Sequence, residues 1–245
     1  MSIAENIASI RAAMREAALA AGRDPAEISL CGATKMNDAD AVRQAVAAGI
    51  DCCGENRVQE LTEKQAQHAY DGAPVHFIGH LQTNKVKQVV GRVALIQSVD
   101  RMNLLQALEK EAARQNLVQD ILLEVNVGRE ESKSGFFPEE LPQVLENMGL
   151  FSHLHVKGLM AIPPVSRFEG ENRRYFTEIY QLSVDIRQKK YDNVCMECLS
   201  MGMSGDFRDA IACGSTMIRI GTAIFGARPY TLNHQAVADA TGQTR

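Results

Sequence analysis

The chain has 245 residues, of which 45% are hydrophobic and 23% are charged, and its formal net charge is -4. Its Lys and Arg residues are scattered, so it lacks the broad basic surface with which proteins neutralise nucleic-acid phosphates. The start, Met1–Asn6, has neither the cationic head nor the apolar stretch of a signal peptide, and no apolar run reaches the ~18 residues of a membrane span. We therefore expect a cytoplasmic protein without nucleic-acid or membrane partners.

Six cysteines are spread along the chain, at positions 31, 52, 53, 195, 198 and 213. In a chain without an export signal such cysteines are usually reduced core residues. Cys195 and Cys198 have the spacing of a redox or zinc pair, but they fall in a predicted strand, where side chains three apart face opposite sides. No second pair of this kind accompanies them, so we expect no metal site.

Apolar periodicity predicts an opening helix and then four strand–helix units in the first half of the chain. The helix is indicated by Ile3, Ile7, Ile10 and Met14, which recur at steps of three and four residues. Short apolar runs bounded by turn residues then alternate with helical patterns. The predicted strands are 28–33, 50–54, 75–78 and 94–98, and the predicted helices are 38–48, 57–68, 81–90 and 102–115.

The second half repeats this alternation. Its predicted strands are 120–127, 156–160, 194–200 and 217–220, separated by the helical stretches 139–148, 171–187 and 207–212. About eight strand–helix steps, in a length that suits one large domain, predict a single α/β unit, a (β/α)8 barrel of the TIM type. An open doubly wound sheet is the rival architecture, although no G-x-G-x-x-G follows the first strand. We expect the barrel domain to span residues 1–230, followed by a polar C-terminal tail, 231–245.

Functional residues of a β/α barrel lie at the carboxyl ends of its strands, and Lys35 ends the first predicted strand. If Lys35 points into the barrel, alternation places Cys31 and Ala33 on the same inward face and turns Leu30 and Thr34 toward the helices. A long amine over this narrow, mostly apolar floor is poorly solvated. Desolvation lowers the pKa of a lysine, and a neutral amine attacks an aldehyde to form an imine. A solvated surface lysine is the alternative.

The last two strands end in segments rich in Ser, Thr and Gly. Loops after strands seven and eight hold a phosphate in many barrels, through backbone N–H groups and hydroxyl donors. Gly221 permits a close approach of the backbone, and Ser200, Ser204 and Thr222 supply hydroxyls. Helix capping by Ser204 and Thr222 is the alternative interpretation, because it uses the same groups.

Arg219 lies within the last predicted strand, between Ile218 and Ile220. If the two isoleucines pack against the helices, the arginine points inward, close to the phosphate loop. A buried guanidinium needs an acceptor and keeps its proton. Opposite a pyridine nitrogen it would donate a hydrogen bond and keep that nitrogen unprotonated. A lysine, a phosphate cup and this arginine together describe a site for pyridoxal 5′-phosphate (PLP).

Seven segments in this order resemble the pyridoxal phosphate homeostasis protein family. They are Gly54–Glu60, His76–Lys85, Ser98–Arg101, Ser132–Gly135, Gly158–Pro163, Ser200–Ser204 and Arg219–Arg228. The resemblance implies a single barrel similar to the N-terminal domain of alanine racemase, with PLP held as a Schiff base on Lys35. It further implies a phosphate cup of Ser200, Ser204, Gly221 and Thr222, Arg219 at the ring nitrogen, and Asn56 near the ring.

One segment departs from the family pattern. The family commonly places a threonine and a proline after the lysine, whereas Lys35 is followed here by Met36-Asn37-Asp38. The lysine is retained, so the departure concerns the shape of the following loop and the tightness of cofactor binding.

The same resemblance favours a carrier over an enzyme. In the racemases a tyrosine from an additional β domain works opposite the lysine, whereas about fifteen residues follow Tyr230, too few for such a domain. Tyr70, Tyr175, Tyr180 and Tyr191 fall away from the predicted strand tips. We expect a PLP-binding protein of intracellular PLP homeostasis that buffers the cofactor and delivers it, with apo PLP-dependent enzymes as the expected partners.

His80 and Asp206 lie near strand ends and are the candidates for proton transfer if the chain is instead a minimal PLP-dependent racemase or lyase. Structural roles at helix starts explain both residues equally well. The resemblance favours a monomer, with a weakly associating dimer as the alternative.

Overall fold

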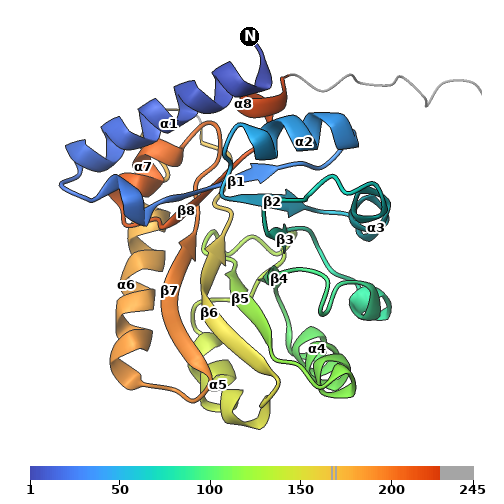
Figure 1. Cartoon of the computed structure of the whole chain (residues 1–245). Helices are drawn as coiled ribbons and strands as arrows, with labels where there is room; N and C mark the ends of the chain where they lie inside the picture. The colour runs from blue at the N-terminus through green and yellow to red at the C-terminus, as the bar shows by residue number, and fades with distance from the viewer. Residues whose placement is uncertain (167, 169, 227–245) are drawn as a thin grey trace, which may run out of the picture.

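Eight parallel strands form a closed barrel in which each strand pairs with its neighbour in sequence and β8 returns to β1 (Figure 1). The structure is a computed structural model that describes residues 1–166, 168 and 170–226. The strands are β1 Ser29–Ala33, β2 Cys52–Glu55, β3 Val75–Phe77, β4 Leu95–Val99, β5 Gln119–Val125, β6 Leu154–Ala161, β7 Val194–Ser200 and β8 Met217–Ile220. The predicted barrel is confirmed and the open sheet is excluded, while the predicted tail, 231–245, lies outside the described residues.

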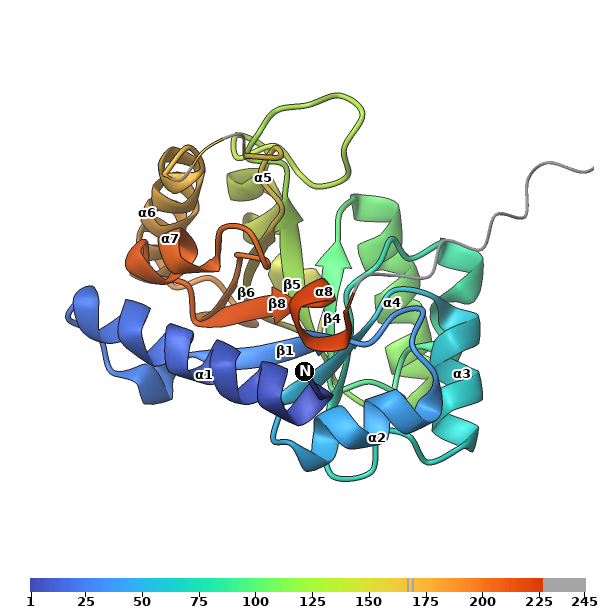
Figure 2. The ribbon, with the colours of Figure 1, turned by 90° about the horizontal axis from the view of Figure 1, so that it is seen from above.

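Helices cover the outside of the barrel (Figures 1 and 2). The α-helices are α1 Ile3–Ala20, α2 Ala39–Ala47, α3 Val58–Ala66, α4 Met102–Gln115, α5 Leu141–Glu146, α6 Arg173–Lys189, α7 Phe207–Ala212 and α8 Thr222–Phe225. Short 3-10 helices are η1 Pro25–Glu27, η2 Thr83–Gln88 and η3 Met148–Leu150. None of the helices in these described ranges is both long and apolar enough to cross a membrane.

The prediction of an α-helix over 81–90 is wrong, because η2 is a 3-10 helix. Its bonds run to the third preceding residue, as from the amide of Val89 to the oxygen of Val86. β-Branched valines lose side-chain freedom in an α-helix, which disfavours the longer α-helix here. The apolar residues that suggested the helix, Leu81, Val86, Val89 and Val90, are nevertheless buried in the core. The predicted helix over 139–148 is likewise shorter, since α5 ends at Glu146 and η3 follows it.

Strand alternation separates an outer core from the barrel interior. Leu30, Ile218 and Ile220 belong to the core between sheet and helices, as predicted from the sequence. Cys31 and Met217 pack together inside the barrel with Cys52 and Cys198. Leu95, Leu122 and Met160 form a further cluster that also contacts Cys198. The interior therefore combines small, flexible and aliphatic side chains, and the larger outer core holds the helices on the sheet.

The opening helix α1 closes the seam where the last strand meets the first. It contacts α2, α7 and α8, and lies beside them in both views (Figures 1 and 2). Ser2 and Glu5 form a capping box at its start, which satisfies two backbone amides. The Asn6 side chain donates to the backbone oxygen of Ile224, 2.8 Å away, and so fixes α8 after β8.

Candidate functional site

The predicted site residues follow four strands that are neighbours in the closed barrel, in the order β7, β8, β1 and β2. Ser200 ends β7 and Ser204 follows it, Arg219 lies in β8 with Gly221 and Thr222 after it, Lys35 follows β1 and Asn56 follows β2. The carboxyl ends of parallel strands open on one face of a barrel. The structure thus gathers all seven residues along one arc of that face.

Lys35 is half-buried and stands in a tight turn directly after β1. The amide of Asn37 donates to the oxygen of Thr34, 3.2 Å away, and closes the turn. Met36 has a φ of +62°, a left-handed conformation that a side chain other than Gly or Asn rarely adopts. This is the loop whose sequence departs from the family pattern, and it is built as a turn with an exposed methionine at the strained position.

A buried charged cluster lies behind this turn, between β2 and α3. One carboxylate oxygen of Glu55, Oε1, accepts hydrogen bonds from the Thr34 hydroxyl at 2.6 Å, from Lys64 at 2.7 Å and from the Tyr70 hydroxyl at 3.0 Å. Burial, followed by the Glu55 charge, raises the pKa of Tyr70 above its usual value. Thr34 faces the helices, as predicted.

Sequence reasoning missed this cluster, although a signal for it is present. Lys64 shares the buried face of α3 with Val58 and Leu61. A charged residue on the apolar face of a helix needs a buried partner. The sequence predicts that Tyr70 lies away from the strand tips, whereas its hydroxyl contacts Glu55, the last residue of β2.

Asn56 carries the amide that the resemblance places near a cofactor ring. Its side-chain oxygen is buried and has no hydrogen-bond partner within the described part of the chain. The backbone of Gly79 packs directly against that of Asn56, because a Cβ at Gly79 would lie 2.3 Å from the Asn56 backbone oxygen. Buried polar atoms nearly always have a hydrogen-bond partner. A polar molecule bound at this face would supply the donor that the Asn56 side-chain oxygen lacks.

Arg219 points into the barrel, as the sequence predicts, and is 5% exposed. One guanidinium nitrogen, Nη1, donates to both the backbone oxygen and the hydroxyl of Ser200, each at 2.6 Å. The other, Nη2, donates to the Ala161 oxygen at 2.9 Å. A guanidinium has five N–H groups, so these contacts orient the group without exhausting its donors. Burial lowers the pKa of Arg219, but an arginine stays charged at neutral pH.

A chain of polar side chains continues from Arg219 across the barrel interior. Ser200 donates its hydroxyl hydrogen to Gln97 at 2.6 Å, and the Gln97 amide nitrogen lies 2.9 Å from Nδ1 of His76. Burial lowers the pKa of His76 to about 4, so its ring is neutral and accepts this bond. Gln97 and His76 were not predicted, because only the register between strands shows that they meet.

The predicted phosphate loops differ in how their hydroxyls are used. Ser200 is fully buried with its hydroxyl engaged by protein partners, whereas the side chains of Ser204 and Thr222 are exposed. Gly221 lies against the end of β1, since a Cβ there would be 3.4 Å from that of Ala33. Loop β8–α8 therefore lies beside the base of the turn that carries Lys35.

Asp206 supports the β7–α7 loop. Its carboxylate accepts from the Met203 amide at 2.7 Å and from the Asn172 side chain at 2.9 Å. The α7 helix begins after it without a side-chain cap from this residue. The carboxylate is thus occupied in holding two segments together, which agrees with a structural role.

Two acidic residues, Glu124 in β5 and Asp100 directly after β4, lie close to each other, and Glu124 also lies close to Arg219. Burial raises the pKa of Glu124 in β5 to about 7, and the Asp100 carboxylate adds to the rise while Arg219 and Arg101 oppose it. Asp100 pairs with Arg101 and also lies 3.1 Å from Nδ1 of His80. His80, which is exposed, therefore has an orienting carboxylate behind it.

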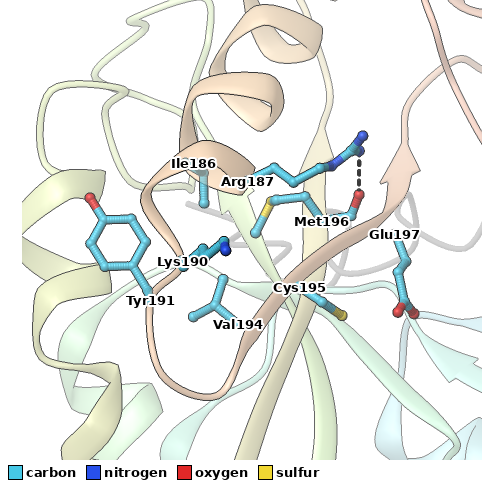
Figure 3. Close-up of a pocket in the computed structure, with 8 residues that line it drawn as sticks. All are labelled: Ile186, Arg187, Lys190, Tyr191, Val194, Cys195, Met196 and Glu197. Carbon is cyan, nitrogen blue, oxygen red and sulfur yellow. Dashed lines mark hydrogen bonds between the residues drawn. The ribbon is translucent and has the colours of Figure 1, made fainter.

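Two of the cavities in the described part of the chain lie away from this face. One of about 560 Å³ is lined by Ile186, Arg187, Lys190, Tyr191, Val194, Cys195, Met196 and Glu197. Figure 3 shows Arg187 reaching to the Met196 backbone oxygen, 2.7 Å away. Glu197 pairs with Lys157 at 2.6 Å. Arg187 and Glu197 of this cavity thus have partners within the protein. The unpartnered amide oxygen of Asn56 lies instead at the carboxyl ends of the strands.

The cysteine pair of residues 195 and 198 is divided between two environments. Cys195 lines the cavity of Figure 3, whereas Cys198 packs inside the barrel with Cys31. Burial raises the pKa of Cys198 to about 11, which keeps its thiol protonated. In the described part of the chain no three His, Cys, Asp or Glu side chains are placed to hold a metal ion.

Comparison with known proteins agrees with this arrangement. The family model for the alanine racemase N-terminal domain matches residues 2–229. A pyridoxal phosphate homeostasis protein of Aquifex aeolicus is 41% identical over 94% of this chain and 100% of its own length. One of Pseudomonas aeruginosa is 42% identical over 94% of this chain and 97% of its own.

Solved structures show the same relationship. PipY of Synechococcus elongatus, solved without PLP, is 32% identical and has a TM-score of 0.81 over 92% of this chain and 100% of that chain. The PipY structure with PLP bound has 31% identity and a TM-score of 0.77 over the same shares. An alanine racemase of Clostridium difficile, 16% identical with a TM-score of 0.63 over 84% of this chain and 54% of that chain, shares the fold. The chain belongs to the pyridoxal phosphate homeostasis protein family.

Proposed function

We propose that this protein binds PLP at the carboxyl ends of β7, β8, β1 and β2, and buffers and delivers it within the cell. The observation that carries the proposal is the inward guanidinium of Arg219 on the strand next to β1, in register with Cys31 and fixed by Ser200 and Ala161. The family names of the relatives and the PLP-bound PipY structure support it.

Each site residue has a distinct part in the proposal. Bound PLP supplies an aldehyde that condenses reversibly with an amine. Lys35 provides that amine from the turn after β1. Ser204, Gly221 and Thr222 hold the phosphate through exposed hydroxyls and backbone amides, and Ser200 orients Arg219 beside them. Arg219 donates to the ring nitrogen and keeps it unprotonated, and Asn56 satisfies its amide oxygen on the bound molecule.

A carrier role is supported by the hydrogen bonds of two residues that could otherwise act as a catalytic acid, Tyr70 and Asp206. The Tyr70 hydroxyl is buried and donates to the Glu55 carboxylate, so its proton is already engaged. Asp206 is occupied by Met203 and Asn172. These contacts leave two natural candidates for a catalytic acid in structural roles. We place the protein in the cytoplasm, as a monomer that passes PLP to apo PLP-dependent enzymes.

One observation favours a second candidate, a minimal racemase or lyase. His80 has the buried carboxylate of Asp100 behind it at 3.1 Å, the arrangement in which an acid orients a histidine base. Solvent-deuterium incorporation at Cα of amino acids separates the two functions, because a carrier requires none. Incorporation that depends on both Lys35 and His80 would establish the enzyme and overturn the carrier.

The proposal is tested by loading the purified protein with PLP and mixing it with an apo PLP-dependent enzyme. We expect the apoenzyme to gain activity while the carrier loses bound PLP, and an Arg219→Lys variant to hold less cofactor at the start. A protein that binds no PLP, or that retains it in the presence of apoenzyme, would contradict binding or delivery respectively.

A further inference from the structure

The turn that carries Lys35 is held from outside the barrel by α3. Lys64 donates to the backbone oxygen of Thr34 at 2.9 Å, and Glu60 accepts from the backbone amide of Met36 at 2.6 Å. Thr34 and Met36 are the neighbours of Lys35 in the chain. The backbone just before and just after the lysine is thus bonded to side chains of one helix.

The bond to Met36 falls where the turn is strained. In a turn closed from Thr34 to Asn37, Met36 occupies the third position, with a φ of +62°. Glycine or asparagine is preferred there, because other side chains meet the backbone. The Glu60 carboxylate therefore supports a backbone conformation that the methionine disfavours.

The three charges behind the turn depend on one another. Lys64, whose side chain is 7% exposed, lies 2.7 Å from a carboxylate oxygen of Glu55 and 3.2 Å from one of Glu60. Glu55 is fully buried. Buried charges without partners are costly, so Lys64 and Glu55 keep fixed positions. Glu60 contacts Lys64 of this fixed pair, and the same carboxylate accepts the hydrogen bond from the Met36 amide.

We propose that Glu60 and Lys64 are positioning residues that direct the Lys35 amine toward the open face of the barrel by clamping the backbone on either side of it. The inference rests on the proposed function, in which Lys35 carries PLP. It explains how a chain without the family's usual residues after the lysine builds a defined turn. Neither residue is expected to touch the cofactor.

The first arm of the test uses protein without PLP. Glu60→Ala removes the acceptor of the Met36 amide and leaves Lys64 paired with Glu55, and alanine suits a helix. We expect NMR hydrogen exchange of the Met36 amide to speed up about tenfold or more, in keeping with the loss of a charge-assisted bond. Glu63→Ala, an exposed residue of the same helix, is the matched control and changes this rate by less than about twofold.

The second arm measures PLP. For Glu60→Ala we expect the dissociation constant to rise about tenfold and borohydride trapping on Lys35 to slow, because the amine spends less time in the productive position. Glu63→Ala should match the parent protein, and Glu60→Gln, which retains an acceptor oxygen, should recover most of the loss. An unchanged thermal midpoint separates this effect from partial unfolding.

A third variant shows whether Glu60 acts through the turn. Met36→Asn places a residue that tolerates the left-handed conformation. In this background the Glu60→Ala loss of PLP binding should shrink to about threefold or less, because less strain is left to offset. An undiminished loss would mean that Glu60 does not act through Met36, and would overturn the inference.

The outcomes keep the two hypotheses apart. If the parent protein traps no PLP on Lys35, the proposed function fails, while the exchange arm still tests the clamp. If the parent protein traps PLP but Glu60→Ala leaves both exchange and binding unchanged, the clamp is wrong and the carrier function stands. Faster exchange with unchanged binding would show that the clamp holds the turn without positioning Lys35, and would also overturn the inference.

Discussion

The hydroxyl of Ser200 accepts a hydrogen bond from Arg219 at 2.6 Å and donates one to Gln97 at the same distance. This pair connects the residue proposed for the ring nitrogen with a polar chain that crosses the barrel to His76. Arg219 is consequently oriented from inside the barrel before any ligand arrives. Preorganisation of this kind lowers the cost of binding.

Ser200→Ala is expected to destabilise the fold. It leaves the Gln97 side-chain oxygen without its donor in the barrel interior, and such a loss costs about 1–3 kcal/mol. Ser204→Ala, at an exposed position, should change the free energy of unfolding by less than about 0.5 kcal/mol while weakening PLP binding. Urea unfolding and a PLP titration check the two variants, and equal destabilisation by both would contradict the assignment.

Arg219→Lys should weaken PLP binding about tenfold, because an ammonium group cannot contact Ser200, Ala161 and a ring nitrogen in one plane. The loss should appear in an absorbance titration of the apo protein. Arg15→Lys, at an exposed site on α1, is the control and should bind PLP as the parent protein does. Equal affinity of all three proteins would remove Arg219 from the site.

Gly79→Ala should disrupt the neighbourhood of Asn56. The new Cβ would lie 2.3 Å from the Asn56 backbone oxygen, so one of the two backbones must move. We expect a loss of about 3 kcal/mol or more in stability, in the range of severe backbone clashes. Gly205→Ala, which meets nothing within 4 Å, should be close to neutral in thermal unfolding. A neutral Gly79→Ala would show that this contact is not tight.

Glu124 should make the free energy of unfolding depend on pH. Burial raises its pKa from 4.5 to about 7 in the folded state, so this group contributes stability below pH 4.5 that is lost as the pH rises through about 7. Glu124→Gln cannot ionise and should gain free energy of unfolding over the parent by on the order of 3 kcal/mol across that window. Denaturant titrations at pH 4.5 and pH 8 measure the difference.

The variant is compared with the parent at each pH because His76 acts in the opposite direction. Its folded pKa is lowered from 6.5 to about 4, so its contribution is present above pH 6.5 and is lost as the pH falls through about 4. The two groups offset each other between these values in the parent protein. A difference that stays constant from pH 4.5 to pH 8 would contradict the raised pKa of Glu124.

Local sequence patterns predict much of the fold and part of the candidate site. The eight-fold alternation of strands and helices predicted the barrel, and period-two alternation predicted that Arg219 points inward while Ile218 and Ile220 face the helices. Both depend on short-range periodicity and on the rule that barrels place function at strand ends. The same rule predicts that Lys35 lies at the open face, and the residue follows the end of β1 in the structure.

The rest depends on contacts between segments that are distant in sequence. Gln97 meets Ser200 only through the register of the closed barrel. Lys64 reaches Thr34 only because α3 packs against β2 at one particular rotation. The segment 83–88 forms a 3-10 helix, which its apolar spacing does not distinguish from an α-helix. Periodicity within a single segment contains none of this information.

The central claim is that the Lys35 amine carries PLP at the open face of the barrel. The most direct measurement is mass spectrometry of peptides after the protein is incubated with PLP and reduced with borohydride. We predict one dominant phosphopyridoxyl modification on Lys35, absent from Lys35→Ala, whose folding is otherwise intact. Modification spread over exposed lysines such as Lys87 and Lys110, with Lys35 unmodified, would contradict the account.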